Sequence, residues 1–208
     1  AYAQADFAAS DAAMVERLAQ LCADDPGTAL LDLGCGPGNI SLLLASRWPA
    51  AKVLGLDGAP RMLAVARERL AGASPDLAAR LRFDQALLPI AAAGELEAHF
   101  SAVVSNSLLH HLHDPAALWQ TVALLGAPGA FVYVQDLRRP DNGEAVEALV
   151  ATEMASAPEV LRHDYRASLH AAFTVVEVEK QLEQAGLAAQ LQVAPRQERY
   201  LEVWGRLN

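Results

Sequence analysis

The chain has 208 residues, of which 53% are hydrophobic and 20% charged, and its mean hydropathy is +0.16. This length allows one domain with a sizeable core, and the composition excludes disordered, collagen-like and disulfide-framework proteins. Sixteen basic against twenty-five acidic residues give a formal charge of −9. A phosphate backbone would be repelled, so nucleic acid is not an expected partner.

Targeting signals are not evident in the sequence. Charged residues, Gln or Pro break every apolar run before the roughly 18 residues that a membrane span needs. Residues 1–11 carry acids where a secretory signal would carry basic residues. We therefore expect a cytoplasmic protein that does not cross a membrane. Cys22 and Cys35 lack the CxxC spacing of a zinc or redox site and are expected to be free thiols.

Short apolar runs rich in β-branched residues alternate with stretches of helical periodicity, which predicts βαβ units around a mostly parallel sheet. The predicted strands are 29–33, 52–56, 81–83, 101–105, 130–135, 188–193 and 200–205. Seven strands fit one Rossmann-like, doubly wound α/β sheet with helices on both faces. The chain is therefore predicted to be a single domain over 1–208.

Two helices have recognisable ends. Asp114, which precedes a proline, predicts a helix start, and Gly126 predicts the end of that helix. Thr174 and Glu177 form a capping box, which opens a helix that stops at Gly186.

Two further helical segments surround the predicted ligand edge of the sheet. The first, about 1–23, is expected to be an amino-terminal lid, with Tyr2 and Phe7 over the ligand. The second, about 142–172, is a strand-free insertion after the fifth strand. Ligands bind outside the carboxyl ends of strands in such sheets, so we expect this insertion to cap the substrate.

Residues 30–40 read LLDLGCGPGNI, which predicts a buried strand, a tight glycine-rich turn and the start of a helix. Glycine is needed where the backbone takes positive φ or where a ligand approaches closely, and three alternate glycines combine both conditions. The dinucleotide fingerprint G-x-G-x-x-G would require glycine at position 39, where this chain has Asn39. This spacing disfavours a pyrophosphate ligand.

Carboxylates follow the next two predicted strands. Asp57 lies about 20 residues after the glycine turn, where an acceptor for two ribose hydroxyls is expected, and it could also cap the following helix. Asp84 follows the third strand and could accept a hydrogen bond from an adenine amino group. Together with Asp32, these acids predict a nucleoside pocket.

Four segments in this order, LLDLGCGPGNISLLLA, VLGLDGAPRMLAVA, RFDQALLP and SNSLLHHLHDP, resemble the class I S-adenosylmethionine-dependent methyltransferases, in the branch that acts on small molecules. The resemblance covers most of the chain and thins over 142–172. It implies the strand order 3-2-1-4-5-7-6 with an antiparallel seventh strand. It also implies S-adenosylmethionine as cofactor, S-adenosylhomocysteine as product and a small-molecule methyl acceptor.

The resemblance carries roles over by position. Asp32 would lie near the cofactor's amino group, Asp57 would hold the ribose and Met62 would pack on the adenine. An acidic pocket suits a positively charged sulfonium. The cofactor-binding residues implied in this way are Asp32, Gly34, Cys35, Gly36, Gly38, Asp57, Gly58, Met62, Asp84, Gln85, Ala86 and Asn106.

The loop after the fourth strand carries three histidines. A metal site there is not favoured, because neighbouring histidines on one short loop cannot all converge on one ion and no further ligands are evident. A general base is needed only where the nucleophile must lose a proton, and His suits that near neutral pH. His110 is the first candidate, His111 the second and Tyr2 the third. Cys35 is expected to be a packing residue.

Arginines and aromatic residues near the insertion suggest an anionic substrate, although solvated surface is the default for Arg. The candidate substrate residues are Phe7, His110, Arg138, Tyr165 and Arg166. A NAD-dependent Rossmann oxidoreductase and a non-catalytic methyltransferase-like binding subunit remain as alternative functions. The acceptor atom and the oligomeric state, monomer or homodimer, stay open.

Overall fold

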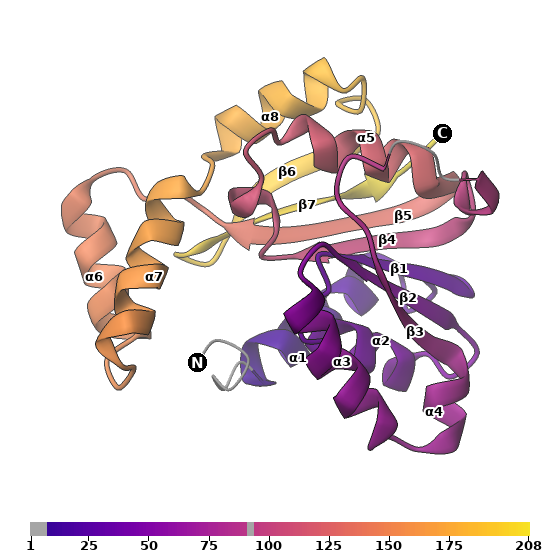
Figure 1. The fold of residues 1–208 in the computed structure, drawn as a ribbon. Coiled ribbons are helices and arrows are strands. Elements are labelled where there is room, and N and C mark those ends of the chain that lie inside the picture. The colour runs from indigo at the N-terminus through magenta and orange to yellow at the C-terminus, as the bar shows by residue number, and fades with distance from the viewer. Residues whose placement is uncertain (1–7, 91–93) are drawn as a thin grey trace.

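The computed structural model describes residues 8–90 and 94–208 and contains one seven-stranded sheet with helices on both faces (Figure 1). The strand order is β3-β2-β1-β4-β5-β7-β6, which confirms the predicted topology. β7 runs antiparallel to both β5 and β6, while the other neighbours are parallel. The strands are β1 (Ala29–Leu33), β2 (Lys52–Asp57), β3 (Leu81–Gln85), β4 (Phe100–Asn106), β5 (Gly126–Leu137), β6 (Leu191–Arg196) and β7 (Tyr200–Arg206).

Two hydrophobic layers enclose the sheet. One packs α1, α2 and α3 on one face around Met14, Leu44 and Leu63. The other packs α5 and α8 on the opposite face around Trp119 and Leu182. The helices are α1 (Ala8–Leu21), α2 (Asn39–Arg47), α3 (Pro60–Ala71), α4 (Pro75–Arg80), α5 (Ala116–Leu125), α6 (Gly143–Glu153), α7 (Glu159–Ala171) and α8 (Val175–Gln184), with single turns η2 (Gly94–Leu96) and η3 (Leu109–His111). None of these described helices is long and apolar enough to cross a membrane.

The capping box of α8 is confirmed, whereas α5 begins one residue later than predicted, with Pro115 and not Asp114 at its N-cap. The Asp114 carboxylate accepts a hydrogen bond from the Ala116 N–H at the start of α5, and α5 ends before Gly126. At α8, the Thr174 hydroxyl accepts from the Glu177 N–H while the Glu177 carboxylate accepts from the Thr174 N–H. Both orphan N–H groups at this helix start are therefore satisfied locally.

The predicted strand 188–193 was wrong by three residues. Leu187 is buried below α8, and its carbonyl accepts hydrogen bonds from the N–H groups of Gln190 and Leu191. This turn uses up residues 188–190, so β6 starts only at Leu191. β5 is longer than predicted, because pairing with β4 already begins at Gly126.

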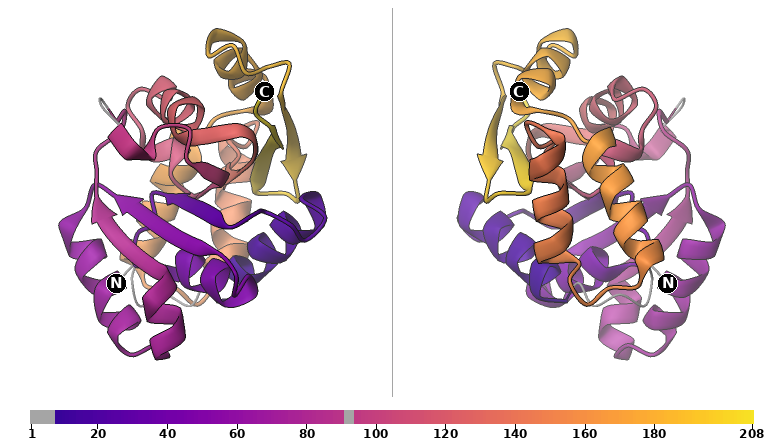
Figure 2. Two further views of the ribbon diagram at one scale, coloured as in Figure 1. Left: turned by 90° about the vertical axis from the view of Figure 1, so that its right-hand side faces the viewer. Right: turned by 90° about the vertical axis from the view of Figure 1, so that its left-hand side faces the viewer.

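The insertion over 142–172 forms two helices, α6 and α7, without a strand. Figure 2 (right) shows both helices standing in front of the carboxyl ends of the sheet. They share a small core of Leu137, Val146, Leu149, Val150, Leu169 and Ala172, separate from the two main layers. α7 also contacts η3, which places the pair beside the histidine loop.

The amino-terminal helix belongs to the core over the part that the structure describes. Met14 and Leu18 of α1 are fully buried, and Arg17 forms an ion pair with Glu202 of β7. Residues 1–7, with Tyr2 and Phe7, lie outside the described residues, so the lid stays a prediction.

Replacing Thr174 with alanine removes one side of the capping box and should lower the free energy of unfolding by about 1 kcal/mol. For a domain of this size the melting temperature would fall by roughly 2–4 °C. Thr152→Ala is the matched control, because its hydroxyl only bonds the Ala148 carbonyl within exposed α6. Equal melting temperatures for the two variants would contradict the capping role.

Candidate active site

The glycine turn between β1 and α2 is held against the end of β2. The N–H groups of Gly34 and Cys35 both donate to the Leu56 carbonyl, at 2.8 and 3.0 Å. The φ angles of Gly34, Gly36 and Gly38 are +72°, +52° and +84°. These positive values explain why the turn requires glycine.

Gly36 is the glycine at which the turn opens. A Cβ atom at Gly34 would strike Leu108 at 2.8 Å, and one at Gly38 would strike Phe83 at 2.8 Å, whereas one at Gly36 would meet nothing within 4 Å. The Gly36 N–H donates to Asp57 Oδ2 at 2.8 Å. The space on the Cβ side of Gly36, which we call its upper face, is therefore open, and the Asp57 carboxylate lies beside it. A ligand can approach the backbone closely at such a position.

Asp57 lies at the carboxyl end of β2 and is half-buried. Its Oδ1 accepts from the Ala59 N–H at 2.7 Å, beside the start of α3. Each carboxylate oxygen keeps lone pairs beyond these bonds. Asp57 therefore supports the local turn and can still accept hydrogen bonds from a ligand, as the sequence suggested.

Asp32 is fully buried in β1 beneath the turn. The Ser41 hydroxyl donates to Asp32 Oδ2 at 2.5 Å. Burial raises the pKa of Asp32 to about 7, and the charges of Asp57 and Asp11 add to the rise. A nearby cation would favour the ionised form and lower this pKa again.

The third strand brings the remaining acid to the same edge. Asp84 is exposed, with Oδ2 3.5 Å from Arg82 Nε. The side chain of Gln85 donates to the Gly58 carbonyl at 3.2 Å, and the Ala86 N–H donates to the Asp57 carbonyl at 3.1 Å. The residues expected to read an adenine thus lie directly beside the expected ribose site.

Met62 is half-buried in the first turn of α3, at this same corner. Asn106 ends β4, and its Oδ1 accepts from Gln135 Nε2 at 3.3 Å. Cys35 is buried in the turn, and burial raises the pKa of its thiol. The neutral thiol is suited to packing, as expected, and not to nucleophilic attack.

His110 and Asp136 form a buried pair behind Asn106. His110 Nδ1 lies 2.6 Å from Asp136 Oδ1, and the Leu109 N–H donates to Asp136 Oδ2 at 2.7 Å. The side chains are 4% and 2% exposed. A carboxylate at Nδ1 favours a proton on that nitrogen, which leaves the lone pair on Nε2.

His111 lies outside this pair. Its ring is exposed, and the centroids of the two imidazoles are 4.0 Å apart. Partial desolvation lowers the pKa of His111, and the neighbouring His110 lowers it further. Of the two histidines, His110 therefore packs inward and His111 faces outward. Within the described ranges, no group of three or more side chains is arranged to hold a metal ion.

The candidate substrate residues that the structure describes lie on different elements; Phe7 lies outside the described residues. Arg138 follows β5 and donates to the Glu198 carbonyl at 2.9 Å. Arg166 bonds Glu147 through two nitrogens, at 2.6 and 3.0 Å, and so joins α7 to α6. Tyr165 packs against the small core of α6 and α7, and burial raises its pKa to about 12. His110 lies on η3, shortly after the end of β4.

Sequence reasoning missed two features of the site. Asp136 was assigned no role, although its position at a strand's carboxyl end matches that of Asp57. The second is a clamp in which Asn39 Nδ2 donates to Asp11 Oδ2 at 2.8 Å while Arg69 donates to the Asn39 and Pro37 oxygens. The clamp connects α1 and α3 to the glycine turn. No spacing of residues in the sequence predicts these contacts.

Comparison with known proteins defines the class. Residues 31–132 match the family model described as "Methyltransferase domain". This segment runs from β1 through the glycine turn into β5. The match shows that this segment belongs to the methyltransferase domain family, and the strand order is the one that the sequence resemblance implied.

Curated relatives give the particular likeness. Over 144 residues the chain is 39% identical to a trans-aconitate 2-methyltransferase of Methylobacterium radiotolerans, covering 69% of this chain and 50% of the relative. Over 129 residues it is 37% identical to the protein of that name from Methylobacterium nodulans, covering 62% and 45%. The chain thus spans about half the length of these relatives.

Solved structures support the fold. A SAM-dependent methyltransferase from Aquifex aeolicus superposes with a TM-score of 0.67 at 16% identity, covering 95% of this chain and 90% of that one. The plantazolicin methyltransferase BamL, solved in complex with a triazolic desmethylPZN analog and SAH, superposes with a TM-score of 0.71 at 13% identity, covering 97% of this chain and 86% of that one.

The raised pKa of Asp32 predicts a pH dependence. Asp32 takes up a proton in the folded protein below pH about 7 but in the unfolded chain only near 3.8. Stability due to this group is therefore present at low pH and is lost as pH rises towards 7. Between pH 5 and pH 8 the unfolding free energy should fall by roughly 2–3 kcal/mol relative to Asp32→Asn, at about 1.36 kcal/mol per pKa unit.

Denaturant unfolding at both pH values measures this difference. Asp164→Asn, an exposed change on α7, is the control and should follow the parent protein. Parallel stability curves for the parent and Asp32→Asn would show that the carboxyl is not protonated in the folded state.

Proposed function

We propose that this chain transfers a methyl group from S-adenosylmethionine to a small-molecule acceptor. The observation that carries the proposal is the open upper face of Gly36, whose N–H is bonded to Asp57. A Cβ at this position would fill the space that a ligand needs, and the acids around it suit a cationic ligand better than a pyrophosphate.

The residues present fit this cofactor by their chemistry. Asp57 would accept hydrogen bonds from the ribose, and Asp32 and Asn106 would lie towards the amino acid end. Met62, Asp84, Gln85 and Ala86 would hold the adenine. The bound cofactor supplies an electrophilic methyl carbon and a neutral thioether leaving group, so this chain contributes alignment of the acceptor.

The buried pair supplies the base. We assign His110 as the general base through Nε2, with Asp136 as the positioning residue that holds Nδ1. His111, with its exposed ring, is the second candidate. A base in this position becomes necessary when the acceptor must lose a proton.

The alternatives receive less support. Neither a nicotinamide-dependent oxidoreductase nor a non-catalytic subunit is favoured by the family match or the named relatives. The relatives' names make a carboxylate acceptor such as trans-aconitate a second candidate substrate class. The cytoplasmic location and the monomeric or homodimeric state stay predictions.

Ligand binding tests the proposal directly. S-adenosylmethionine or S-adenosylhomocysteine at 100 times its Kd should add about 2.7 kcal/mol of stability, a rise of several degrees in melting temperature, whereas NADH should add none. Gly36→Ala should weaken adenosyl binding at least about tenfold, because its Cβ occupies the open face. Gly94→Ala is the matched control, since Gly94 has φ +54° and an equally open Cβ position away from the site. Stabilisation by NADH alone would overturn the proposal.

Single substitutions in the loop test the base. His110→Ala and Asp136→Asn should lower the rate of methyl transfer by about 10²–10⁴-fold, the usual contribution of general base catalysis, without changing adenosyl affinity. His111→Ala should have a smaller effect, and His99→Ala, an exposed change at the opposite edge, none. The assay follows label from methyl-labelled S-adenosylmethionine into a deproteinised bacterial metabolite extract. A full rate with His110→Ala would remove this histidine from the mechanism.

A further inference from the structure

We propose that a buried relay of hydrogen bonds orients the side-chain amide of Asn106, whose Nδ2 then donates to the carboxylate at the amino acid end of the cofactor. The relay consists of Glu202, Tyr133 and Gln135, which are positioning residues that act through Asn106. The inference rests on the proposed function and deepens it by assigning these residues to the same site.

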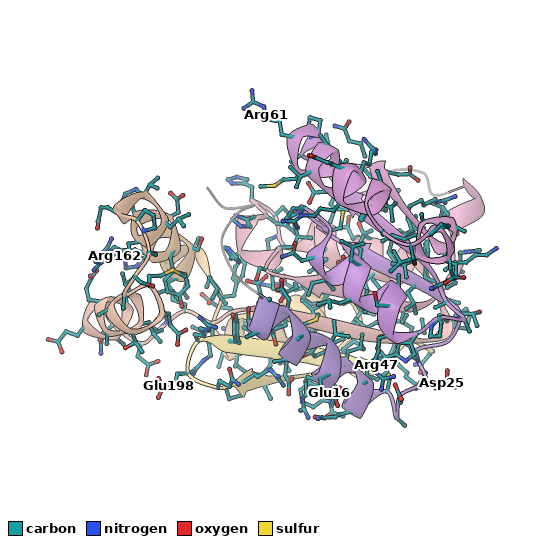
Figure 3. The ribbon with its side chains drawn as sticks, turned by 90° about the horizontal axis from the view of Figure 1, so that it is seen from below. Glu16, Asp25, Arg47, Arg61, Arg162 and Glu198 are labelled. Carbon is teal, nitrogen blue, oxygen red and sulfur yellow. The ribbon has the colours of Figure 1, made fainter. Side chains whose placement is uncertain are left out.

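The relay lies in one row across the sheet. Gln135 of β5 is paired with Asn106 of β4 on one side and with Glu202 of β7 on the other. Side chains of paired residues point to the same face, and so does Tyr133, two residues before Gln135. Tyr133 belongs to the hydrophobic layer that packs under α1. Seen from below, α1 lies in front of the sheet beside the yellow strands β6 and β7 (Figure 3).

The row begins at a firmly held carboxylate. Glu202 is buried, and Arg17 of α1 donates to both of its oxygens, at 2.6 and 3.0 Å. Arg196 of β6 donates to Oε2 of the same carboxylate at 3.4 Å. Although burial opposes ionisation, the bonds from Arg17 keep the pKa of Glu202 below its usual value. Two guanidinium groups therefore compensate the charge of Glu202 and fix its position.

The Tyr133 hydroxyl joins Glu202 to Gln135. Tyr133 is fully buried, and burial raises its pKa, so the hydroxyl keeps its proton. The hydroxyl oxygen lies 3.3 Å from Glu202 Oε2 and 3.4 Å from Gln135 Oε1. Because two arginines already satisfy Glu202, the single phenolic proton is available to Gln135 Oε1. This contact turns the amide oxygen of Gln135 towards Tyr133 and the amide nitrogen towards Asn106.

Gln135 decides which end of the Asn106 amide is free for a ligand. Gln135 is buried, and its Nε2 donates to Asn106 Oδ1 at 3.3 Å. Asn106 is half-buried at the carboxyl end of β4. An amide whose oxygen is engaged in this way keeps its NH₂ group for other partners. Asn106 therefore offers a donor at the edge of the sheet where the ligand is expected.

The position of Asn106 relative to Asp32 suits the two charges of an amino acid. Asp32 of β1 is paired with Val104 of β4, and Asn106 lies two residues further along β4 on the same face. An ammonium group is attracted by the carboxylate of Asp32, whereas a carboxylate group needs a donor. The Asn106 Nδ2 supplies this donor close to Asp32.

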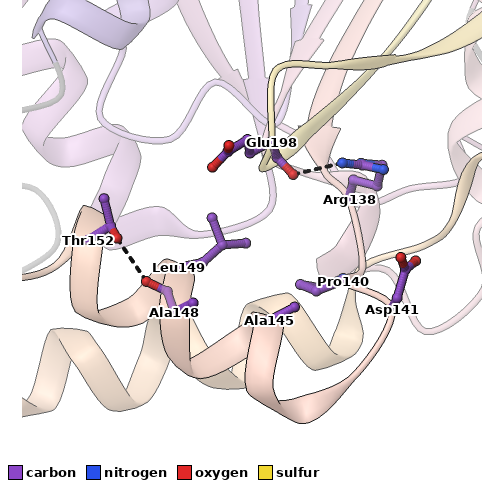
Figure 4. Close-up of a pocket in the computed structure, with 8 residues that line it drawn as sticks. All are labelled: Arg138, Pro140, Asp141, Ala145, Ala148, Leu149, Thr152 and Glu198. Carbon is purple, nitrogen blue, oxygen red and sulfur yellow. Dashed lines mark hydrogen bonds between the residues drawn. The ribbon is translucent and has the colours of Figure 1, made fainter.

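The arginine that follows β5 points elsewhere. Arg138 lines a hollow of about 270 Å³ between α6 and the turn that joins β6 to β7 (Figure 4). Its guanidinium donates to the Glu198 carbonyl at 2.9 Å. Arg138 is thus directed towards the side of α6, while Gln135, three residues earlier, is directed along the relay to Asn106.

Truncated forms of the cofactor product test the relay by calorimetry. The probes are S-adenosylhomocysteine, its decarboxylated form, and methylthioadenosine, which lacks the whole amino acid end. Asn106→Ala and Gln135→Leu should each weaken S-adenosylhomocysteine binding about tenfold, the effect of losing a hydrogen bond to a charged group. Tyr133→Phe should weaken it by roughly threefold, because the hydroxyl acts through Gln135. The affinities for the two truncated probes should change by less than about twofold.

A double variant separates the relay from a general loss of structure. Tyr133→Phe should cause no further loss of S-adenosylhomocysteine affinity when Asn106 is already alanine, because residues of one network are not additive. Thr121→Val is the matched control, since it removes a buried hydroxyl of α5 on the opposite face of the sheet. This control should leave all three affinities unchanged.

Several results would overturn the inference. Equal weakening of S-adenosylhomocysteine and its decarboxylated form by Asn106→Ala would mean that the amide contacts a group other than the carboxylate. Unchanged S-adenosylhomocysteine affinity in Gln135→Leu and Tyr133→Phe would mean that the relay does not act on the ligand. In both cases binding of methylthioadenosine would leave the proposed function standing. A parent protein that binds none of the adenosyl probes would reject the proposed function itself and the inference with it.

Discussion

Three consecutive backbone N–H groups, those of Gly34, Cys35 and Gly36, all point to the end of β2, and the site depends on this arrangement. The first two donate to the Leu56 carbonyl and the third to Asp57. Such a turn forces positive φ at Gly34 and Gly36, which restricts both positions to glycine. These three hydrogen bonds satisfy the N–H donors of the turn, and the space at the Cβ position of Gly36 stays empty. Asp57 is held in place by the same bonds and presents its free lone pairs to that face.

Two of the buried aspartates, Asp136 and Asp32, are stabilised in different ways. Asp136 receives hydrogen bonds at both oxygens, from a backbone N–H and from an imidazole, so its charge is compensated within the protein. Asp32 accepts hydrogen bonds from the Ser41 hydroxyl and the Ser41 backbone, yet burial raises its pKa to about 7. The negative charge of an ionised Asp32 is therefore only partly stabilised by its hydrogen bonds. A cationic ligand nearby would stabilise that charge further. Asp136 is thus fixed by two bonds to the histidine loop, while Asp32 keeps a raised pKa beneath the glycine turn.

The sequence predicted the sheet and the glycine turn well, because each of these elements carries its own local signal. Alternate glycines mark the turn, apolar runs mark the strands, and acids mark the strand ends. It placed β6 wrongly because the buried Leu187 and the turn behind it depend on packing against the far side of the sheet. Asp136 could be read as a strand end, but its bond to His110 joins residues 26 apart and requires the finished fold.

The arginines show the opposite limitation. Their concentration after β5 suggested an anionic ligand, yet the folded chain places a glutamate or a carbonyl against most of them. Arg166 meets Glu147 across 19 residues and Arg199 meets Glu153 across 46. Such pairings depend on how α6 and α7 fold back on one another. Composition alone therefore overstates the charge that a ligand would encounter.

The separate small core of α6 and α7 gives the fold a modular character. Apart from the flanking chain, the described contacts of this helical pair with the rest of the fold are local: Leu137 of β5, Tyr200 of β7, the turn η3 and the Arg199–Glu153 ion pair. Substitutions within the pair can therefore accumulate without disturbing β1, β2 or the glycine turn. The helical pair is therefore a unit whose surface can vary while the sheet that carries Gly36 and Asp57 keeps its own packing.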